Sequence, residues 1–469
     1  MTISSNYRPS TAILCFSLLS SLSCVTNAST VCAVGCNYTS IATAVSAAAP
    51  GDTITLTDSF YNESGIVIDK DLTIRGSVGF LQKATIDAAG ADRIFHITGA
   101  ASNVILSKLA LINGDATAAR GGAIRVESGI VSARYLRFEN NFADAGGAIA
   151  LAGGTRLVTF LSTFAGNSAS QGGAIHCTAC EEVLTTYSKF SDNLATEGGA
   201  LYADSANSII DYRSRFDRNS SGKGGALYVR NTALAVTGST FAENNSNSGM
   251  ADSGGAIYAY GSRPVTISFS TFRSNLATAG GAGGAVALEN PGWAGAPGIN
   301  AHIWNSTFSR NEAVAGGAIQ SMQNNNVEIT NVTFYENTTN GGVAGTLAGG
   351  FEINNSILVN APAIGPFPVA PCDGFGNIVT AVGGNLFENP NGSCGLPNLP
   401  VTNIDPNLTM TGVTLSRTAT HALLPGSNAI DNGAANCPSP VTGAPLVKDQ
   451  RMRARPNGAG CDIGAYERY

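Results

Sequence analysis

A short motif, Gly-Gly-Ala followed by Ile, Leu or Val, recurs eight times in this chain and restricts its fold more than any other feature. Successive copies begin 25 to 33 residues apart, at Gly121, Gly146, Gly172, Gly198, Gly224, Gly254, Gly283 and Gly316. Each repeat also contains Phe-x-x-Asn, which begins at Phe138, Phe164, Phe190, Phe216, Phe241, Phe272, Phe308 and Phe334. Two motifs locked to one period indicate a single structural unit that is stacked on itself.

The residue pattern within one repeat predicts short strands. In residues 172–178, alternation places Ala174 and His176 on one face and Ile175 and Cys177 on the other. The Phe-x-x-Asn segment and a further apolar stretch have the same strand character, and no helical spacing is present, which excludes helical repeats. A chain that advances by strand and turn in one sense, with its copies in register, forms a parallel β-solenoid whose coils lie roughly 4.8 Å apart.

Equivalent residues of a solenoid stack in columns, and each motif therefore predicts one column. We expect the phenylalanines to fill the interior, and the glycine pair to form a bend that needs positive φ or close backbone approach. The asparagines are expected at a turn, where their amides bond backbone groups of adjacent coils. This role is structural rather than catalytic, for Asn141, Asn167, Asn193, Asn219, Asn244, Asn275, Asn311 and Asn337.

Composition and charge exclude some classes of partner. The chain has 469 residues, 43% of them hydrophobic but only 7% aromatic, which suits a long, thin core. Its net charge of −6 and pI near 5.3 provide no basic stripe, so neither nucleic acid nor an anionic membrane is expected as the main partner. Binding of an acidic polymer would need a local basic patch.

The N-terminus has the features of a secretory signal. Arg8 precedes an apolar run over residues 12–19, and small residues follow up to Ala28. This pattern predicts a signal peptide over residues 1–28 with cleavage near Ala28. The apolar run is too short to span a membrane, so no transmembrane segment is expected after the signal is removed. Lipidation at Cys24 is a weaker alternative to simple export.

After such cleavage an even number of cysteines remains, which is typical of disulfide bonding in an exported protein. Sequential pairing would close four local loops, although the sequence does not prove the connectivity. Glu181 and Glu182 lie beside a Cys-x-x-Cys pair and would raise its thiol pKa, which favours a structural disulfide over a redox site. Zinc would need four convergent ligands, and we expect no metal site. The cysteines are Cys32, Cys36, Cys177, Cys180, Cys372, Cys394, Cys437 and Cys461.

The paired motifs resemble the repeats of chlamydial polymorphic outer-membrane proteins and, more broadly, the pectate-lyase-like right-handed β-helix superfamily. The resemblance covers roughly residues 121–350. Residues 38–76 look like the entry of such helices, a short amphipathic capping helix followed by the first coils. Its apolar stripe is Ile41, Ala44, Val45 and Ala48. The resemblance implies a right-handed parallel β-helix, with its N-terminal cap, over residues 29–360.

The C-terminal part, residues 361–469, is similar to the Pro/Gly-rich choice-of-anchor segment of exported bacterial β-helix proteins. One departure is Met452, where that pattern usually has Gly. The resemblance implies secretion or surface association, with disulfide bonds in this segment. The matching stretches are Asp405-Pro406, residues 424–433, Asp449-Gln450-Arg451 and residues 461–467.

Outward positions after the Gly-Gly-Ala motifs form the candidate site. Three stacked tyrosines are flanked by polar side chains on neighbouring coils, and such rings can either simply cover the strands or present flat apolar faces to sugars. Asp204 and Arg230 could bond sugar hydroxyls or a uronate carboxylate. The predicted ligand-binding residues are Tyr202, Tyr228, Tyr258, Tyr260, Asp204 and Arg230.

Enzymatic alternatives are restricted by spacing. A glycoside hydrolase needs two carboxylates roughly 5 to 9.5 Å apart, whereas Glu127 and Asp204 would lie three coils, roughly 14 Å, apart. A lyase needs a base near the acidic proton of the sugar and a cation on its carboxylate, and His176 and Arg230, with Asp204 nearby, would lie two coils apart, about 10 Å. Calcium is conceivable only for such a lyase; otherwise no cofactor is expected.

These observations favour an exported, adhesin-like protein that binds a glycan or a cell surface and is not an enzyme. A polysaccharide lyase acting on uronate polymers is the alternative from a different class. A purely structural rod is the third, because one solenoid fold serves all three roles.

Overall fold

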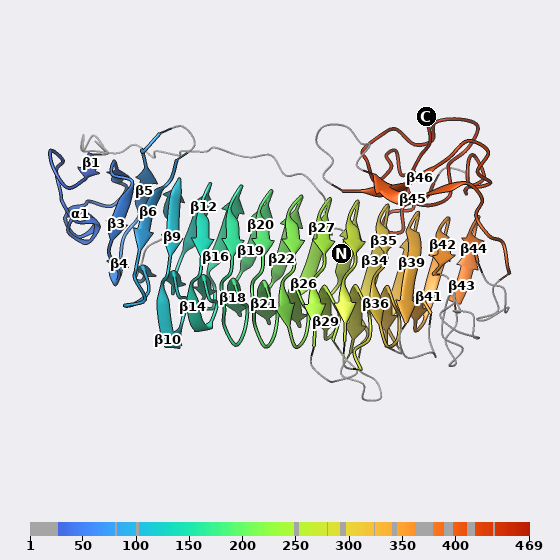
Figure 1. Ribbon diagram of the computed structural model, residues 1–469, viewed down its shortest axis with the longest axis horizontal. Helices are drawn as coiled ribbons and strands as arrows, with labels where there is room; N and C mark the ends of the chain where they lie inside the picture. The colour runs from blue at the N-terminus through green and yellow to red at the C-terminus, as the bar shows by residue number, and fades with distance from the viewer. Residues whose placement is uncertain are drawn as a thin grey trace, which may run out of the picture.

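The computed structural model describes residues 27–79, 82–99, 103–247, 253–278, 280–290, 297–322, 324–339, 345–361, 379–388, 397–409, 418–434 and 437–469. It is a parallel β-solenoid, in which strands of successive coils stack side by side along the length of the molecule (Figure 1). The all-β fold expected from the repeats is therefore confirmed. The predicted signal peptide lies almost entirely outside the described residues.

Three sheets run along the solenoid, and we call them A, B and C. Sheet A has 14 strands: β1 (Ala28–Val31), β2 (Thr53–Leu56), β5 (Leu72–Gly76), β8 (Asn103–Ser107), β12 (Ile130–Arg134), β16 (Arg156–Phe160), β19 (Glu182–Thr186), β22 (Ser208–Tyr212), β26 (Ala233–Thr237), β30 (Val265–Ser268), β34 (Asn300–Trp304), β38 (Asn326–Thr330), β41 (Phe351–Asn354) and β43 (Val379–Val382). Sheet C has 11 strands: β4 (Ile66–Ile68), β7 (Phe95–Ile97), β11 (Ile124–Val126), β15 (Ile149–Leu151), β18 (Ile175–Thr178), β21 (Leu201–Asp204), β25 (Leu227–Arg230), β29 (Ile257–Tyr260), β33 (Val286–Glu289), β37 (Ile319–Ser321) and β40 (Leu347–Ala348).

Sheet B follows sheet A in every coil and contains the Phe-x-x-Asn motifs. Its strands are β3 (Phe60–Asn62), β6 (Ala84–Asp87), β9 (Leu109–Ile112), β13 (Arg137–Glu139), β17 (Thr163–Ala165), β20 (Lys189–Ser191), β23 (Arg215–Asp217), β27 (Thr240–Ala242), β31 (Thr271–Arg273), β35 (Thr307–Ser309), β39 (Thr333–Thr339), β42 (Ile357–Asn360) and β44 (Leu386–Phe387). Short strands between sheet B and the glycine pairs, here called the D strands, are β10 (Asp115–Arg120), β14 (Phe142–Ala145), β24 (Ser220–Ser221), β28 (Asn245–Ser246), β32 (Leu276–Ala277) and β36 (Glu312–Ala313).

The glycine pair turns the chain sharply between the D strands and sheet C. Gly172 has φ +63°, and a Cβ there would collide with the backbone carbonyl of Ile175, three residues later. A Cβ on Gly173 would collide with the carbonyl of Gly199 in the next coil. Both positions of the motif therefore exclude a side chain, the first by conformation and the second by the close spacing of coils.

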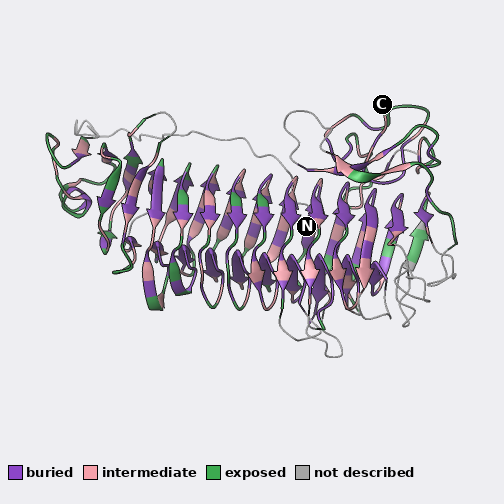
Figure 2. Ribbon diagram, viewed as in Figure 1, coloured by how far each residue is buried: buried purple, intermediate pink, exposed green. Residues whose placement is uncertain are grey.

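The phenylalanine column lies in the interior, as predicted. The eight rings are buried, and seven successive pairs stack with centroids 4.5 to 5.2 Å apart. Buried residues run along the whole solenoid in the same way (Figure 2). Because each ring contacts the ring above and the ring below, loss of one ring leaves a gap between two flat neighbours.

The asparagine column satisfies the backbone at the turn after sheet B. Asn167 donates from Nδ2 to Oδ1 of Asn193 at 2.9 Å and to the carbonyl of Phe138 at 3.2 Å. Its own Oδ1 accepts from the backbone N–H of Asn141 at 3.1 Å. The same arrangement recurs along the column, which confirms the structural role predicted for it.

A serine column at the corner between sheets A and B was not predicted. The hydroxyl oxygen of Ser214 accepts from the backbone N–H of Ser188 at 3.2 Å, and that of Ser239 accepts from Ser214 at 3.1 Å. In these coils the serine stands two residues before the buried phenylalanine, so the signal was present in the sequence. The serine hydroxyls provide hydrogen-bond partners for the buried backbone groups at this corner.

The N-terminal cap is the helix expected from the sequence. Helix α1 (Ile41–Ala47) begins after Ser40, whose hydroxyl accepts from the N–H of Thr43, and buries Ile41, Ala44 and Val45 against the first coils. The carboxylate of Glu63 accepts from the N–H of Ile41 at 2.8 Å. A carboxylate at a helix N-terminus satisfies donors that lack partners within the helix.

The coils continue beyond residue 360, where we expected the solenoid to end. β43 pairs in parallel with β41, and β44 pairs in parallel with β42. The chain then returns, and the described residues between 397 and 469 lie over the outside of sheet B near β31, β35 and β39 (Figure 1). Here β45 (Ile404–Thr409) and β46 (Thr420–Leu423) form an antiparallel pair.

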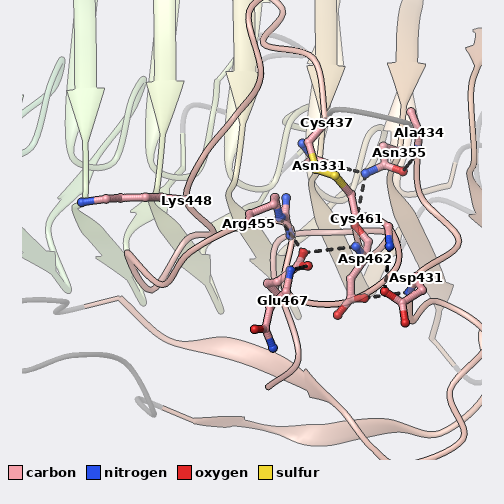
Figure 3. The surroundings of a disulfide bond; sticks show 12 residues. Asn331, Asn355, Asp431, Ala434, Cys437, Lys448, Arg455, Cys461, Asp462 and Glu467 are labelled. Carbon is pink, nitrogen blue, oxygen red and sulfur yellow. Dashed lines mark hydrogen bonds and ion pairs between the residues drawn. A yellow bond between two sulfur atoms is a disulfide. The ribbon is translucent and has the colours of Figure 1, made fainter.

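Polar side chains fix this C-terminal segment to the solenoid. Gln450 donates to the carbonyl of Ser270 at 3.1 Å and accepts from the Thr307 hydroxyl at 2.6 Å. Arg455 is buried beside the disulfide between Cys437 and Cys461 (Figure 3) and donates to Asn305 Oδ1 at 3.0 Å. The segment is thus attached by specific hydrogen bonds to sheet B.

Three of the four expected disulfides are present. They join Cys32 to Cys36, Cys177 to Cys180, and Cys437 to Cys461 (Figure 3). Each pairs neighbours in sequence order, and the second lies on β18 and its exit, as predicted. Cys372 and Cys394 lie outside the described residues.

Candidate functional site

The structure brings the predicted tyrosine column together on sheet C. Tyr202, Tyr228 and Tyr258 are in register on β21, β25 and β29, with ring centroids 5.1 and 4.9 Å apart. His176 on β18 stacks on Tyr202 at 5.4 Å with nearly parallel rings. The predicted order of residues along the column is therefore confirmed.

This column is covered, which the sequence left open. Tyr202, Tyr228 and Tyr258 are only 4%, 6% and 2% exposed. The residue before the glycine pair lies over the outer face of sheet C in this region, as shown by Lys223, whose Nζ lies 5.0 Å from the Tyr258 ring centroid. The rings thus pack between two layers of the protein, and this arrangement does not support their stacking against sugars.

Asp204, Arg230 and Tyr260 lie at the edge of the covered column. Arg230 Nη2 donates to Asp204 Oδ2 at 2.5 Å, and this hydrogen bond raises the pKa of Arg230. Burial acts to raise the pKa of Asp204, but the hydrogen bonds from Arg230 and Ser205 outweigh it and lower that pKa. Because each charge neutralises the other, the geometry does not present Arg230 as an open carboxylate receptor.

His176 is poorly placed to act as the base of a lyase. It is 1% exposed, and its Nε2 lies 3.2 Å from the Thr178 hydroxyl. Burial, reinforced by the positive charges of Arg120 and Arg125, lowers the pKa of His176 to about 4. The lyase prediction for His176, Arg230 and Asp204 gains no support from this geometry. Among the described residues, no group of three or more His, Cys, Asp or Glu side chains could hold a metal ion.

The burial of His176 predicts a loss of stability in acid. Its pKa is about 4 in the folded protein and 6.5 ordinarily, so the unfolded chain binds the proton more tightly between these values. The neutral ring contributes its full stabilisation above pH ~6.5. As the pH falls to ~4, the free energy of unfolding decreases by up to about 3 kcal/mol. We expect the difference in unfolding free energy between wild type and His176→Gln to change by this amount across that range in urea titrations. A difference that stays constant with pH would contradict this.

A second aromatic surface, not predicted from the sequence, lies on the outside of the corner between sheets A and B. We call Tyr135, Phe160, Tyr187 and Tyr212 the aromatic stripe. The centroids of its successive rings are 5.6, 6.2 and 5.9 Å apart, and each pair packs edge to face. Tyr135 is 44% exposed and the other three are partly exposed. The stripe crosses four consecutive coils.

Basic side chains lie next to the stripe on the outer face of sheet B. Arg137, Lys189 and Arg215 are exposed and occupy one register position, with Thr163 between the first two. The next position contains acidic partners, such as Glu139, 3.2 Å from Arg137. We call Arg137, Lys189 and Arg215 the basic column; Arg137 is paired with Glu139 and Arg215 with Asp217, so an acidic polymer would have to compete with these partners.

A cavity of about 360 Å³ lies where the C-terminal segment begins to cover sheet B. Its lining includes Arg215, Arg273 and Arg310 of the solenoid, and Leu408 and Ala419 of the C-terminal segment. Arg273 and Arg310 are paired with Glu243 and Glu336. The basic column therefore continues into a hollow formed by the two parts of the chain.

Position relative to the buried phenylalanine could have revealed this surface. Tyr135 and Tyr187 stand three residues before that phenylalanine, Phe160 and Tyr212 stand four before it, and the basic column stands one before it. The predicted site rests on the residues after Gly-Gly-Ala, where alternation is regular. The aromatic residues of the stripe alternate between two adjacent columns, so neither column by itself shows a repeating aromatic residue.

The fold and its surfaces define the class as an all-β protein built on a parallel β-solenoid. Residues 122–292 match the family model described as the right-handed beta helix region. Comparison with curated proteins gives no significant match. Among the described residues, no helix has the length and apolar character needed to cross a membrane.

Proposed function

We propose that this protein is an exported, non-catalytic protein that binds an acidic glycan or a glycan-bearing cell surface through the aromatic stripe and the basic column. The observation that carries the proposal is that both run in parallel over the same four coils, from β13 to β23. A linear polymer lying along the solenoid would meet a ring and a polar or basic side chain in each coil. Three disulfides within the chain suit an oxidising, extracellular compartment.

The chemistry of the two surfaces is complementary for such a ligand. Aromatic rings offer flat apolar area to the faces of sugar rings, and tyrosine adds a hydroxyl that can hydrogen-bond. Arginine binds carboxylate or sulfate groups through two parallel hydrogen bonds. Arg213 lies between the rings, with its guanidinium 5.0 Å from the Tyr212 centroid, and donates to the Tyr187 hydroxyl at 3.0 Å. This contact holds two rings of the stripe in place before any ligand binds.

The fold alone does not require bulky residues at this corner. Tyr135 and Tyr187 have φ +56° and +50°, a left-handed conformation that is unfavourable for large side chains. At the equivalent corner, other coils have Gly238 and Asn331, residue types that adopt it more easily. Leu161, Arg213 and Phe269 occupy the same left-handed position in other coils, so the corner accepts varied residue types and can carry aromatic rings.

The test is binding of the purified protein to an array of neutral, uronate-containing and sulfated glycans. Replacing Tyr135, Tyr187 and Tyr212 together by Ser removes three ring contacts of roughly 0.5–1.5 kcal/mol each, so affinity should fall at least about tenfold. Phe142→Ser is the matched control, because this ring is 44% exposed but lies on D strand β14 rather than in the stripe. It should leave binding unchanged.

A second set of variants separates the contribution of charge. Arg137→Gln combined with Lys189→Gln should weaken acidic ligands more than neutral ones and reduce the salt dependence of binding. Equal binding by wild type and the triple Tyr variant would refute the proposal. Release of unsaturated uronate products would instead favour the lyase, and absence of any ligand would favour the structural rod.

A further inference from the structure

The column that contains the covered tyrosines continues toward the N-terminus with charged residues. His96 on β7 is in register with Arg125 on β11, Arg125 with Ala150, and Ala150 with His176. The same outward position thus changes from aromatic to ionisable within a few coils. This end of sheet C is separate from the aromatic stripe, which lies at the corner of sheets A and B.

This end of sheet C is also where the covering layer stops. Among the described residues, the D strands begin with β10, which pairs with β14. Exposure along the column changes accordingly: Val67 on β4 is 52% exposed, the side chain of His96 is 32% exposed, that of Arg125 is 17% exposed, and Ala150 is fully buried. The column therefore opens to solvent at its charged end.

A cavity of about 470 Å³ occupies this opening. Sheet C contributes His96, Arg125 and Glu127, and the end of β10 contributes Arg120. The remaining lining residues are Asp92, Arg93 and Ala119. Three guanidinium groups thus border one small cavity.

The two carboxylates of the lining, Asp92 and Glu127, do not saturate its four basic side chains, although Asp92 Oδ1 lies 3.8 Å from Arg93 Nε. Glu127 Oε1 lies 3.0 Å from His96 Nε2, without hydrogen-bond alignment, and 3.9 Å from Arg125 Nε. Arg93 donates to the carbonyl of Arg120 at 2.9 Å. Nη1 of Arg125 is buried and has no hydrogen-bond partner among the described residues. A buried donor of this kind is costly unless something accepts from it.

Like charges add to this cost. Burial lowers the pKa of Arg125. The positive charges of Arg120 and Arg93 also lower this pKa, whereas the negative charge of Glu127 raises it. The positive charges of Arg120 and Arg125 act as far as His176. An anion in the cavity would lie against the exposed part of the Arg125 guanidinium and reduce the repulsion between the arginines.

We propose that this cavity is a binding site for one oxyanion group, a carboxylate or a sulfate, held by Arg125 with Arg93, Arg120 and His96 around it. The planar guanidinium of Arg125 provides paired donors that match either group. Glu127 positions Arg125 and His96 through its contacts with both. The proposal does not depend on the aromatic stripe, and either site could fail its test without the other.

The test uses the whole protein and inorganic sulfate as the probe, in thermal unfolding and titration calorimetry. Sodium sulfate should bind saturably and raise the melting temperature more than sodium chloride at equal ionic strength. Arg125→Met, which keeps the apolar stem and removes the charge, should lower sulfate affinity at least tenfold. It should also melt higher than wild type without sulfate, because the buried unpartnered donor and the charge repulsion are gone.

Controls separate the site from general salt effects, since sulfate stabilises many proteins by exclusion from their surface. Arg75→Met removes an exposed arginine of sheet A, on β5, that belongs to neither proposed site, and it should keep the full sulfate response. Sodium glucuronate and inorganic phosphate, titrated in parallel, identify which group the cavity prefers. Arg120→Gln changes an exposed side chain of the lining and should also weaken sulfate binding. A wild-type response equal to that of chloride, or an Arg125→Met response equal to wild type, would overturn the proposal.

Discussion

Replacing Phe190 by Ala is expected to lower the free energy of unfolding by about 3–5 kcal/mol. The ring is fully buried and stacks between Phe164 at 4.6 Å and Phe216 at 4.8 Å. Its removal leaves a cavity that the neighbouring coils cannot close, because hydrogen bonds of sheets A, B and C fix the spacing between them. Urea unfolding followed by circular dichroism measures the change.

The matched control is Lys189→Ala in the same strand. Lys189 is exposed and precedes the buried ring, so its loss should change stability by no more than about 0.5 kcal/mol. Both substitutions shorten a side chain of β20 to Ala, one buried in the phenylalanine column and the other exposed. Equal, small effects of the two substitutions would show that the phenylalanine column contributes little to stability.

The interior could be predicted from the sequence because solenoid geometry converts position in a repeat into position in space. Each buried phenylalanine and asparagine has a counterpart one period away, and a column follows from the parallel register alone. The parallel register likewise predicts the tyrosine column of Tyr202, Tyr228 and Tyr258. The register does not determine whether that column is exposed. Exposure depends on how the chain folds before Gly198 and Gly224, where the turn places Glu197 and Lys223 over the rings.

Surfaces made by non-repeating residues could not be predicted from the repeat pattern. Arg125 occupies the same column as Tyr202, but Arg125 lines a cavity whereas Tyr202 is covered. The difference arises because, among the described residues, no D strand lies over β7. Likewise, the C-terminal segment covers part of sheet B. Contacts such as Gln450 to Ser270, which join residues 180 positions apart, determine where the exposed part of the sheet ends. Such contacts leave no periodic signal.

The C-terminal segment contains the second position at which a single substitution should have a large effect. Arg455 and Glu467 form an ion pair with side chains fully removed from solvent, and Arg455 Nε donates to Glu467 Oε2 at 2.9 Å. Arg455 also donates to Asn305 on the solenoid and to the carbonyl of Gly464 at 2.8 Å. Glu467 accepts from the backbone N–H of Asn457 at 2.8 Å. The ion pair, which Figure 3 shows beside the disulfide, thus joins parts of the C-terminal segment to the corner between sheets A and B at Asn305.

Glu467→Gln keeps the shape of the side chain but leaves the Arg455 guanidinium buried without its counter-charge. Removing one partner of a buried ion pair costs about 3–5 kcal/mol, because the remaining charge must stay desolvated or the structure must open. Since Arg455 is what connects the segment to Asn305, we expect residues 397–469 to detach before the solenoid unfolds. Urea unfolding should show an early transition, and limited proteolysis should cut this segment at denaturant concentrations that leave the coils intact.

The exposed pair of Arg218 and Asp192 provides the control, with the same chemistry and an Nε to Oδ1 distance of 2.8 Å. About half of each side chain is exposed, so Asp192→Asn should cost less than about 1 kcal/mol. The contrast isolates burial as the cause, because charge, geometry and the kind of substitution are matched. If Glu467→Gln unfolds in one step at the wild-type midpoint, the C-terminal segment must be held by its apolar contacts and disulfide rather than by this ion pair.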